Sequence, residues 1–217
     1  RVATKCYLPM NALLSRAIAR YGARMKVSFS FSGTVLEQFE KHMPEVLSSF
    51  QELVKTGSVE VLGETYYHSL ASIHDVKEFD EQVYEHSKKI RSLFGVTPRV
   101  FRNTELIYDN ALAAHVSQLG FAGMLAEGAD RVLQGRSPGE AYRAKDRPIR
   151  VLLKNYKLSD DIAFRFSKTS WKHYPLTPQE YASWLLREEG KSVNLFMDYE
   201  TFGEHHWQES GIFSFME

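Results

Sequence analysis

Carboxylates follow two stretches of this sequence that have the pattern of buried strands. The mostly apolar residues 193–197 lead directly into Asp198, and residues 99–104 lead into Glu105. A dense polar and aromatic group comes just after the first of these, including Glu200, His205 and Trp207. Parallel sheets expose functional side chains at the carboxyl ends of their strands, so both carboxylates are candidates for one catalytic rim.

Two carboxylates on one rim can divide the work of a nucleophile and a general acid if their surroundings differ. Arg102 precedes Glu105 by three residues, and its guanidinium would keep that carboxylate ionised if it approached it. Arg102 could equally form a structural salt bridge or contact substrate. Asp198 has aromatic neighbours that would enclose it and let it supply a proton; these are Phe196, Tyr199 and Phe202.

The elements that must position these residues alternate between strand and helix patterns. Strands are predicted near residues 25–31, 59–62, 99–104, 121–125, 150–155 and 193–198. Helices are predicted at residues 10–21, 35–38, 44–55, 75–94, 110–119, 158–166 and 178–189, and residues 131–147 are predicted to be a loop.

This alternation predicts an α/β fold with parallel strands joined by right-handed connections. An incomplete or irregular β/α barrel fits the strand count, and an open doubly wound sheet is the alternative. Residues 1–217 are predicted to form a single, partial catalytic barrel domain. In either architecture Tyr66, Glu105 and Asp198 would lie just past strand ends on the same rim.

The composition excludes several classes of partner. Basic and acidic residues number 27 each, and no basic run with interleaved aromatic residues is present, so nucleic acid is not expected as a partner. No apolar stretch is long enough to span a membrane. Cys6 is the only cysteine, which excludes an internal disulfide and favours a reducing compartment, so a cytoplasmic location is expected.

Three motifs resemble, in the same order, those of family 57 glycoside hydrolases. The first is Glu-Thr-Tyr-Tyr-His-Ser-Leu at residues 64–70, and the second is Phe-Arg-Asn-Thr-Glu-Leu at residues 101–106. The third is Asp-Tyr-Glu-Thr-Phe-Gly-Glu-His at residues 198–205. Residues 29–33 and 158–161 also fit segments of that family, so the resemblance runs through most of the chain.

The resemblance implies an enzyme that hydrolyses or transfers α-glucans on an incomplete seven-stranded β/α barrel, by a retaining mechanism without a metal or other cofactor. Glu105 matches the family's nucleophile, and Asp198 matches its general acid/base. In a retaining pair the two carboxyl groups lie about 5 Å apart, so that one attacks the anomeric carbon while the other protonates the leaving oxygen.

The chain departs from the family at its ends. Family members begin with a strand that ends in His-Gln-Pro, and this sequence contains no such tripeptide. We therefore expect the chain to lack the first strand of the barrel. We also expect it to lack the helical region that follows the barrel in the family. The choice between hydrolysis and transfer, the linkage preference, the chain-length range and the oligomeric state stay open.

The remaining polar residues have substrate-binding roles in this interpretation. His68 and His205 are expected to bond sugar hydroxyls, Tyr67 and Trp207 to stack on pyranose faces, and Glu200 to orient Asp198 or bridge to an arginine. Two alternatives remain. A metal-dependent polysaccharide deacetylase would use histidines, although the adjacent His205 and His206 point in different directions on an extended segment. A non-catalytic α-glucan-binding domain would keep the binding residues without turnover.

Overall fold

The computed structural model describes all of residues 1–217, and the contacts within the chain divide it into two compact units. The first unit comprises Arg1–Ala17, Gly128–Glu140 and Leu153–Glu217. The second unit comprises Ile18–Glu127 and Ala141–Leu152. Each unit is described separately, and the prediction of a single domain stays a prediction.

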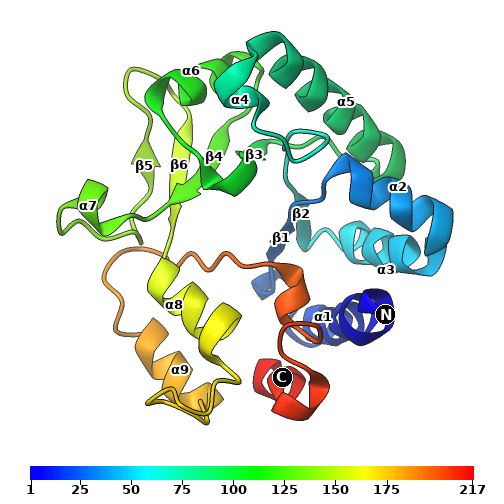
Figure 1. Ribbon diagram of the computed structural model, residues 1–217, viewed down its shortest axis with the longest axis vertical. Coiled ribbons are helices and arrows are strands. Elements are labelled where there is room, and N and C mark those ends of the chain that lie inside the picture. Colours follow the sequence, from blue (N-terminus) through cyan, green and yellow to red (C-terminus); the bar gives the residue numbers. More distant parts are fainter. The chain divides into compact units, whose positions relative to one another are not determined.

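Short strands, most of them parallel, form the centre of the second unit (Figure 1). They are β1 (Val27–Phe29), β2 (Val59–Val61), β3 (Val100–Arg102), β4 (Gly123–Glu127), β5 (Tyr142–Arg143) and β6 (Arg150–Lys154), whose last two residues belong to the first unit. β1 pairs with β2 in parallel, and the other strands form a sheet in the order β3-β4-β6-β5. β3 and β4 are parallel, whereas the edge strand β5 is antiparallel to β6.

The backbone of Gly63 connects β2 to β3. Its amide donates to the carbonyl of Val100, and its carbonyl accepts from the amide of Arg102, both over 2.8 Å. A side chain at this position would meet the ring of Phe121, because a Cβ would lie only 2.6 Å from it. The absence of a side chain at Gly63 therefore lets the segment after β2 lie close to the end of β3. Both segments lead into the candidate site.

Helices connect the parallel strands of the second unit, and their ends follow local sequence signals. They are α2 (Gly33–His42), α3 (Pro44–Lys55), α4 (Ala71–His74), α5 (Val76–Phe94) and α6 (Asn110–Gln118). Asp75 caps α5 by accepting from the amides of Lys77 and Glu78, and Gly95 ends it in the left-handed conformation. The predicted helix over residues 75–94 is thereby confirmed. No helix of the structure is long and apolar enough to cross a membrane.

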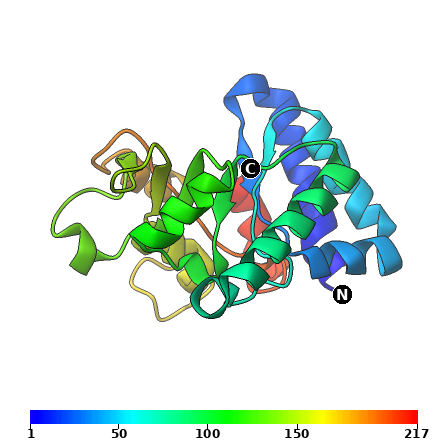
Figure 2. The ribbon, with the colours of Figure 1, turned by 90° about the horizontal axis from the view of Figure 1, so that it is seen from above.

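The helices α2, α3 and α5 group beside the β1–β2 pair, and α3 contacts α2, α5 and β2 (Figure 1 and Figure 2). Their apolar faces enclose a cluster of phenylalanine rings. Phe50 packs edge-on against Phe29 and Phe31, with ring centroids 5.2 and 4.9 Å apart. This core holds the strands from which the candidate site projects.

The first unit is built from short helices and turns. They are a π-helical turn (Ala3–Tyr7), α1 (Leu8–Tyr21, which ends in the second unit), α7 (Asp130–Leu133), α8 (Tyr156–Asp160), a second π-helical turn (Asp161–Arg165), α9 (Pro178–Leu185) and α10 (Ile212–Met216). Thr177 caps α9 by accepting from the amide of Glu180, and Pro178 occupies its first turn, as the sequence predicts.

The prediction of a buried strand at residues 193–198 is wrong. The segment belongs to no sheet, and Leu195 is 36% exposed. It is held by separate bonds in place of a ladder: the carbonyl of Asn194 accepts from the amide of Asn155, and the hydroxyl of Ser159 accepts from the amide of Phe196. One of these contacts is to a backbone amide and the other to a side chain, and both use groups that a neighbouring strand would otherwise bond.

The predicted loop over residues 131–147 also contains regular structure, since α7 overlaps its start and β5 lies near its end. β5 consists of only two residues, too few for an alternating pattern to be visible in the sequence. With these corrections, the fold is α/β with parallel strands.

Candidate active site

Four charged side chains gather beyond the ends of β2 and β3 in the second unit. His68 Nε2 lies 3.2 Å from Glu105 Oε1, and its Nδ1 lies 3.8 Å from Glu64 Oε1. Arg102 Nη1 lies 3.6 Å from Glu64 Oε2 and 3.3 Å from His68 Nδ1. His68 therefore stands between an inner carboxylate and an outer one. Of the roles left open for Arg102, the structure shows a salt bridge, because the guanidinium forms its ion pair with Glu64 and reaches Glu105 only through His68.

Glu64 is the buried anchor of this cluster. Its side chain is 3% exposed, and it also accepts a hydrogen bond from the hydroxyl of Ser30. Burial alone would raise the pKa of Glu64, but the hydrogen bonds from His68 and Ser30 and the charge of Arg102 hold that pKa below its usual range. The residue is thus a fixed negative charge under the site.

Glu105 has the opposite environment. It lies in the 3₁₀ turn Thr104–Leu106 with a positive φ of 53°, and 73% of its side chain is exposed. The turn is held from below by Asn103, whose buried amide donates to the carbonyl of Ile107 over 3.1 Å. His68 also has a positive φ, of 51°. Such conformations are costly for residues other than glycine and cluster at functional sites.

The charge state of His68 is set by its carboxylate neighbours. The contact with Glu64 is the largest cause that raises the pKa of His68, and the contact with Glu105 adds to it, while burial and Arg102 oppose them. The raised pKa favours the protonated imidazole, which can donate a hydrogen bond toward the outer carboxylate or a ligand.

We expect the imidazole of His68 to titrate above the ordinary value of 6.5, as followed by its NMR chemical shifts. Because the pKa is higher in the folded state, the stability that His68 contributes is complete below pH 6.5 and is lost as the pH rises through the folded value. Glu64→Gln should lower the pKa of His68. A midpoint that does not move in this variant would show that Glu64 does not control the charge of His68.

The segment that follows Asp198 is fastened to the N-terminal helical turn within the first unit. Tyr7 donates a hydrogen bond to Glu200, and Tyr199 donates to Asn11 Oδ1 over 2.6 Å. The rings of Tyr7 and Tyr199 are stacked, with centroids 6.2 Å apart. Asp198 itself is exposed, so the expected enclosure by aromatic neighbours is wrong. Glu200, expected to orient Asp198 or bridge to an arginine, accepts from Tyr7.

Further contacts hold the same segment in place. The buried thiol of Cys6 donates to the carbonyl of Tyr199 over 3.1 Å, and burial raises its pKa to about 12. Gly203 has a φ of +113° and packs so closely that a Cβ would lie 1.9 Å from the carbonyl oxygen of Lys5. The ammonium of Lys5 lies 4.8 Å from the ring centre of Trp207, which is 57% exposed. Because more than half of its surface is exposed, the indole of Trp207 can contact a ligand despite the neighbouring ammonium.

The two adjacent histidines of the first unit point to different environments. His205 is exposed, whereas His206 is buried. His206 Nε2 donates to the carbonyl of Ile162 over 2.7 Å, and Nδ1 accepts from the hydroxyl of Ser167 over 2.7 Å. Burial lowers the pKa of His206, which fits a neutral structural imidazole. Within residues 1–217, no group of three His, Cys, Asp or Glu side chains is placed to hold a metal ion.

The predicted site residues therefore fall into two sets. The second unit brings His68 and Arg102 together with Glu105, and Tyr67 lies nearby in sequence, 61% exposed. The first unit holds Asp198, Glu200, His205 and Trp207. Sequence reasoning missed two residues as site members, Glu64 and Tyr7. Glu64 was visible as the first polar residue past a strand, but nothing in the sequence marks Tyr7.

The sequence profile described as glycosyl hydrolase family 57 matches residues 1–217. The chain belongs to this family. A curated protein of Methanocaldococcus jannaschii, described as "Putative alpha-amylase", is 47% identical over 217 residues. The alignment covers 100% of this chain and 46% of that protein, so the chain spans about half the length of this family 57 relative.

Solved structures share the fold. The 4-α-glucanotransferase of Thermococcus litoralis matches with a TM-score of 0.78 at 20% identity, over 99% of this chain and 33% of that one. The family 57 branching enzyme of Pyrococcus horikoshii matches with a TM-score of 0.71 at 15% identity, over 98% and 60% of the two chains. The match with the glucanotransferase likewise spans a third of a longer protein.

Proposed function

We propose that this chain is part of the catalytic barrel of a family 57 enzyme that hydrolyses or transfers α-glucans by a retaining mechanism. The observation that carries the proposal is the presentation of Glu105. An exposed carboxylate lies on a strained turn beyond a parallel strand, next to a histidine that also contacts the ion pair between Arg102 and the buried Glu64. Family membership and the relatives described as an amylase and a glucanotransferase supply the substrate class.

In this proposal Glu105 attacks the anomeric carbon, and Asp198 protonates the leaving oxygen. The new bond joins the Glu105 carboxylate to the sugar while the glycosidic bond breaks. Asp198 then removes a proton from water or from a sugar hydroxyl, which displaces the sugar from Glu105 and restores both groups. Water as the acceptor gives hydrolysis, and a sugar hydroxyl gives transfer.

The other predicted residues bind substrate in the same proposal. His68 bonds a sugar hydroxyl beside Glu105, and Arg102 holds the Glu64–His68 pair in position. Tyr67 and Trp207 offer exposed rings for pyranose faces, whereas Glu200 and His205 bond hydroxyls near Asp198. The fold proposed for the intact enzyme is an incomplete (β/α)₇ barrel, which the consecutive order of β1, β2, β3 and β4 supports.

The test is incubation of the full-length natural protein with maltoheptaose, with the products followed by mass spectrometry. Shorter glucans are expected if water is the acceptor, and a ladder of longer and shorter glucans if a sugar is. Binding of maltoheptaose without any new product would overturn the proposal in favour of a non-catalytic glucan-binding domain.

A further inference from the structure

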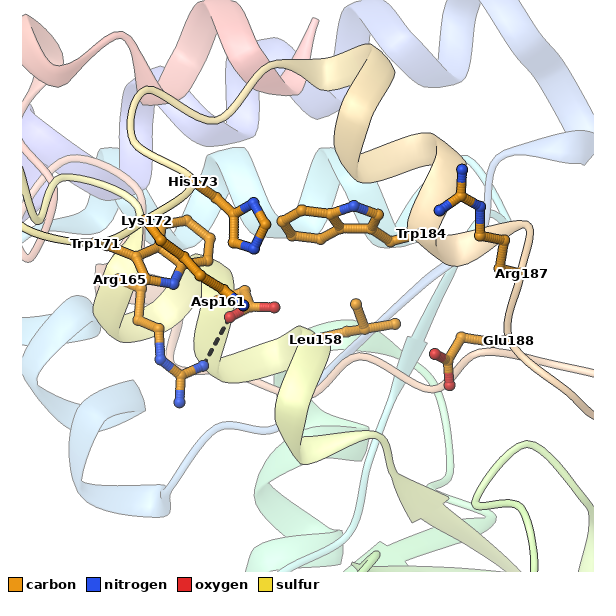
Figure 3. Close-up of a pocket in the computed structure, with 9 residues that line it drawn as sticks. All are labelled: Leu158, Asp161, Arg165, Trp171, Lys172, His173, Trp184, Arg187 and Glu188. Atoms are coloured by element: carbon orange, nitrogen blue, oxygen red, sulfur yellow. Dashed lines mark hydrogen bonds and ion pairs between the residues drawn. The ribbon is translucent and has the colours of Figure 1, made fainter.

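A pocket in the first unit contains none of the residues proposed for catalysis or for substrate binding near Glu105 and Asp198. It has a volume of about 460 Å³ and is formed by α8, the π-helical turn after it, the loop around Lys172 and the end of α9 (Figure 3). This volume falls within the roughly 300–1,000 Å³ typical of small-molecule sites.

Aromatic rings form one side of the pocket. Trp171, His173 and Trp184 lie in a row, opposite the side chains of Leu158 and Asp161 (Figure 3). His173 and Trp184 have ring centroids 4.7 Å apart and meet edge to face at 72°, and the two indoles meet at 82°. Edge contacts of this kind fix the rings against each other. Both indoles remain half-buried, so part of each ring surface is open to the pocket.

Charged groups of both signs surround these rings. Arg165 donates to Asp161 over 2.7 Å and lies at one end of the pocket, and Arg187 and Glu188 lie toward the other (Figure 3). Glu188 is itself held by a hydrogen bond of 2.6 Å from the side-chain amide of Asn155. The site thus presents fixed donors and fixed acceptors next to apolar ring surface.

This combination matches a neutral sugar better than an anion. Each sugar hydroxyl both donates and accepts, so it can use guanidinium and carboxylate groups at the same time. The C–H face of a pyranose is apolar and packs on an indole. A phosphate would gain from the arginines but would face the carboxylates of Asp161 and Glu188.

We propose that this pocket is a second carbohydrate site, which binds a segment of an α-glucan chain away from the reacting bond. The identity of the ligand rests on the proposed function, whereas the location of the site rests on the rings and charges of the pocket. Such a site would hold a long glucan to the enzyme through successive turnovers, with little effect on a short substrate.

The test uses affinity electrophoresis of the full-length natural protein in gels that contain amylose, in a Glu105→Gln background so that the gel is not digested. We expect Trp184→Ala to weaken retention about 3- to 10-fold, the range for the loss of one aromatic contact. Arg187→Ser should weaken retention as well. Because Arg187 is exposed, this variant should fold, so it tests the inference even if Trp184→Ala does not fold. Phe164→Ala is the matched control, since Phe164 lies on the same π-helical turn as Asp161 and Arg165, is 67% exposed and does not line the pocket.

Equal retention of all these variants would overturn the inference. Competition is expected from maltoheptaose and not from inorganic phosphate, and the reverse result would overturn the assignment to a neutral sugar. The proposed function is tested separately by maltoheptaose turnover in the protein that retains Glu105. Turnover with retention independent of Trp184 refutes only the pocket, whereas Trp184-dependent retention without turnover refutes only the proposed function.

Discussion

Replacing Glu105 with Gln should lower the rate of α-glucan turnover by a factor on the order of 10⁴ or more, the scale seen when a catalytic nucleophile is removed. An amide of the same shape cannot attack the anomeric carbon, so no glycosyl-enzyme forms. Folding should be almost unaffected, because the side chain is 73% exposed and substitutions at such positions change stability by less than about 0.5 kcal/mol.

The measurement is the rate of product formation from maltoheptaose by the full-length natural protein, beside its thermal unfolding midpoint. Glu60→Gln is the matched control, since Glu60 is an exposed carboxylate on β2 of the same unit. A Glu105→Gln variant that turns over substrate at close to the native rate would assign the nucleophile to another residue.

Replacing Glu64 with Gln should destabilise the second unit by about 2–3 kcal/mol. Removing one partner of a buried ion pair typically costs about 3–5 kcal/mol, and the cost is lower here because Arg102 and His68 can reach water. The folded pKa of Glu64 is depressed, so its contribution is present above its ordinary value of 4.5 and is lost as the pH falls through the folded value. The difference between the two proteins should therefore shrink in acid.

Denaturant unfolding at neutral and acid pH measures this difference, with Glu60→Gln on the preceding strand β2 again as the control. If Glu64→Gln and Glu60→Gln have equal effects at neutral pH, Glu64 is not the electrostatic anchor of the cluster. Turnover should also fall in the Glu64 variant, because His68 loses the contact that does most to hold its proton.

Much of the fold could be predicted because its signals are local. The ends of α5 follow from Asp75 and Gly95, and the start of α9 follows from Thr177 and Pro178, since each acts within one helical turn. The expected strand at residues 193–198 failed for the opposite reason. A short apolar run is compatible with a strand, but its hydrogen-bond partners decide whether it joins a sheet. Here the partners are the amide of Asn155 and the hydroxyl of Ser159, and neither lies on a neighbouring strand.

The candidate site was predictable in part for the same reason. Motif positions identified His68, Arg102 and Glu105, and the structure brings these three together. The sequence could not show that Arg102 pairs with Glu64, because that choice depends on how two strand ends meet. Nor could it show the positive φ of His68 and Glu105. A positive φ is usually predicted from a glycine, and neither of these residues is one.

The most direct test of the mechanism is to trap the glycosyl-enzyme. An Asp198→Asn variant of the full-length natural protein is incubated with an α-glucosyl fluoride, whose leaving group needs no proton, so the first step proceeds while the second lacks its base. Proteolysis and mass spectrometry should then find a glucosyl mass on the peptide that contains Glu105. A glucosyl mass on a different residue, or turnover with no adduct at all, would contradict the assignment of Glu105 as the nucleophile.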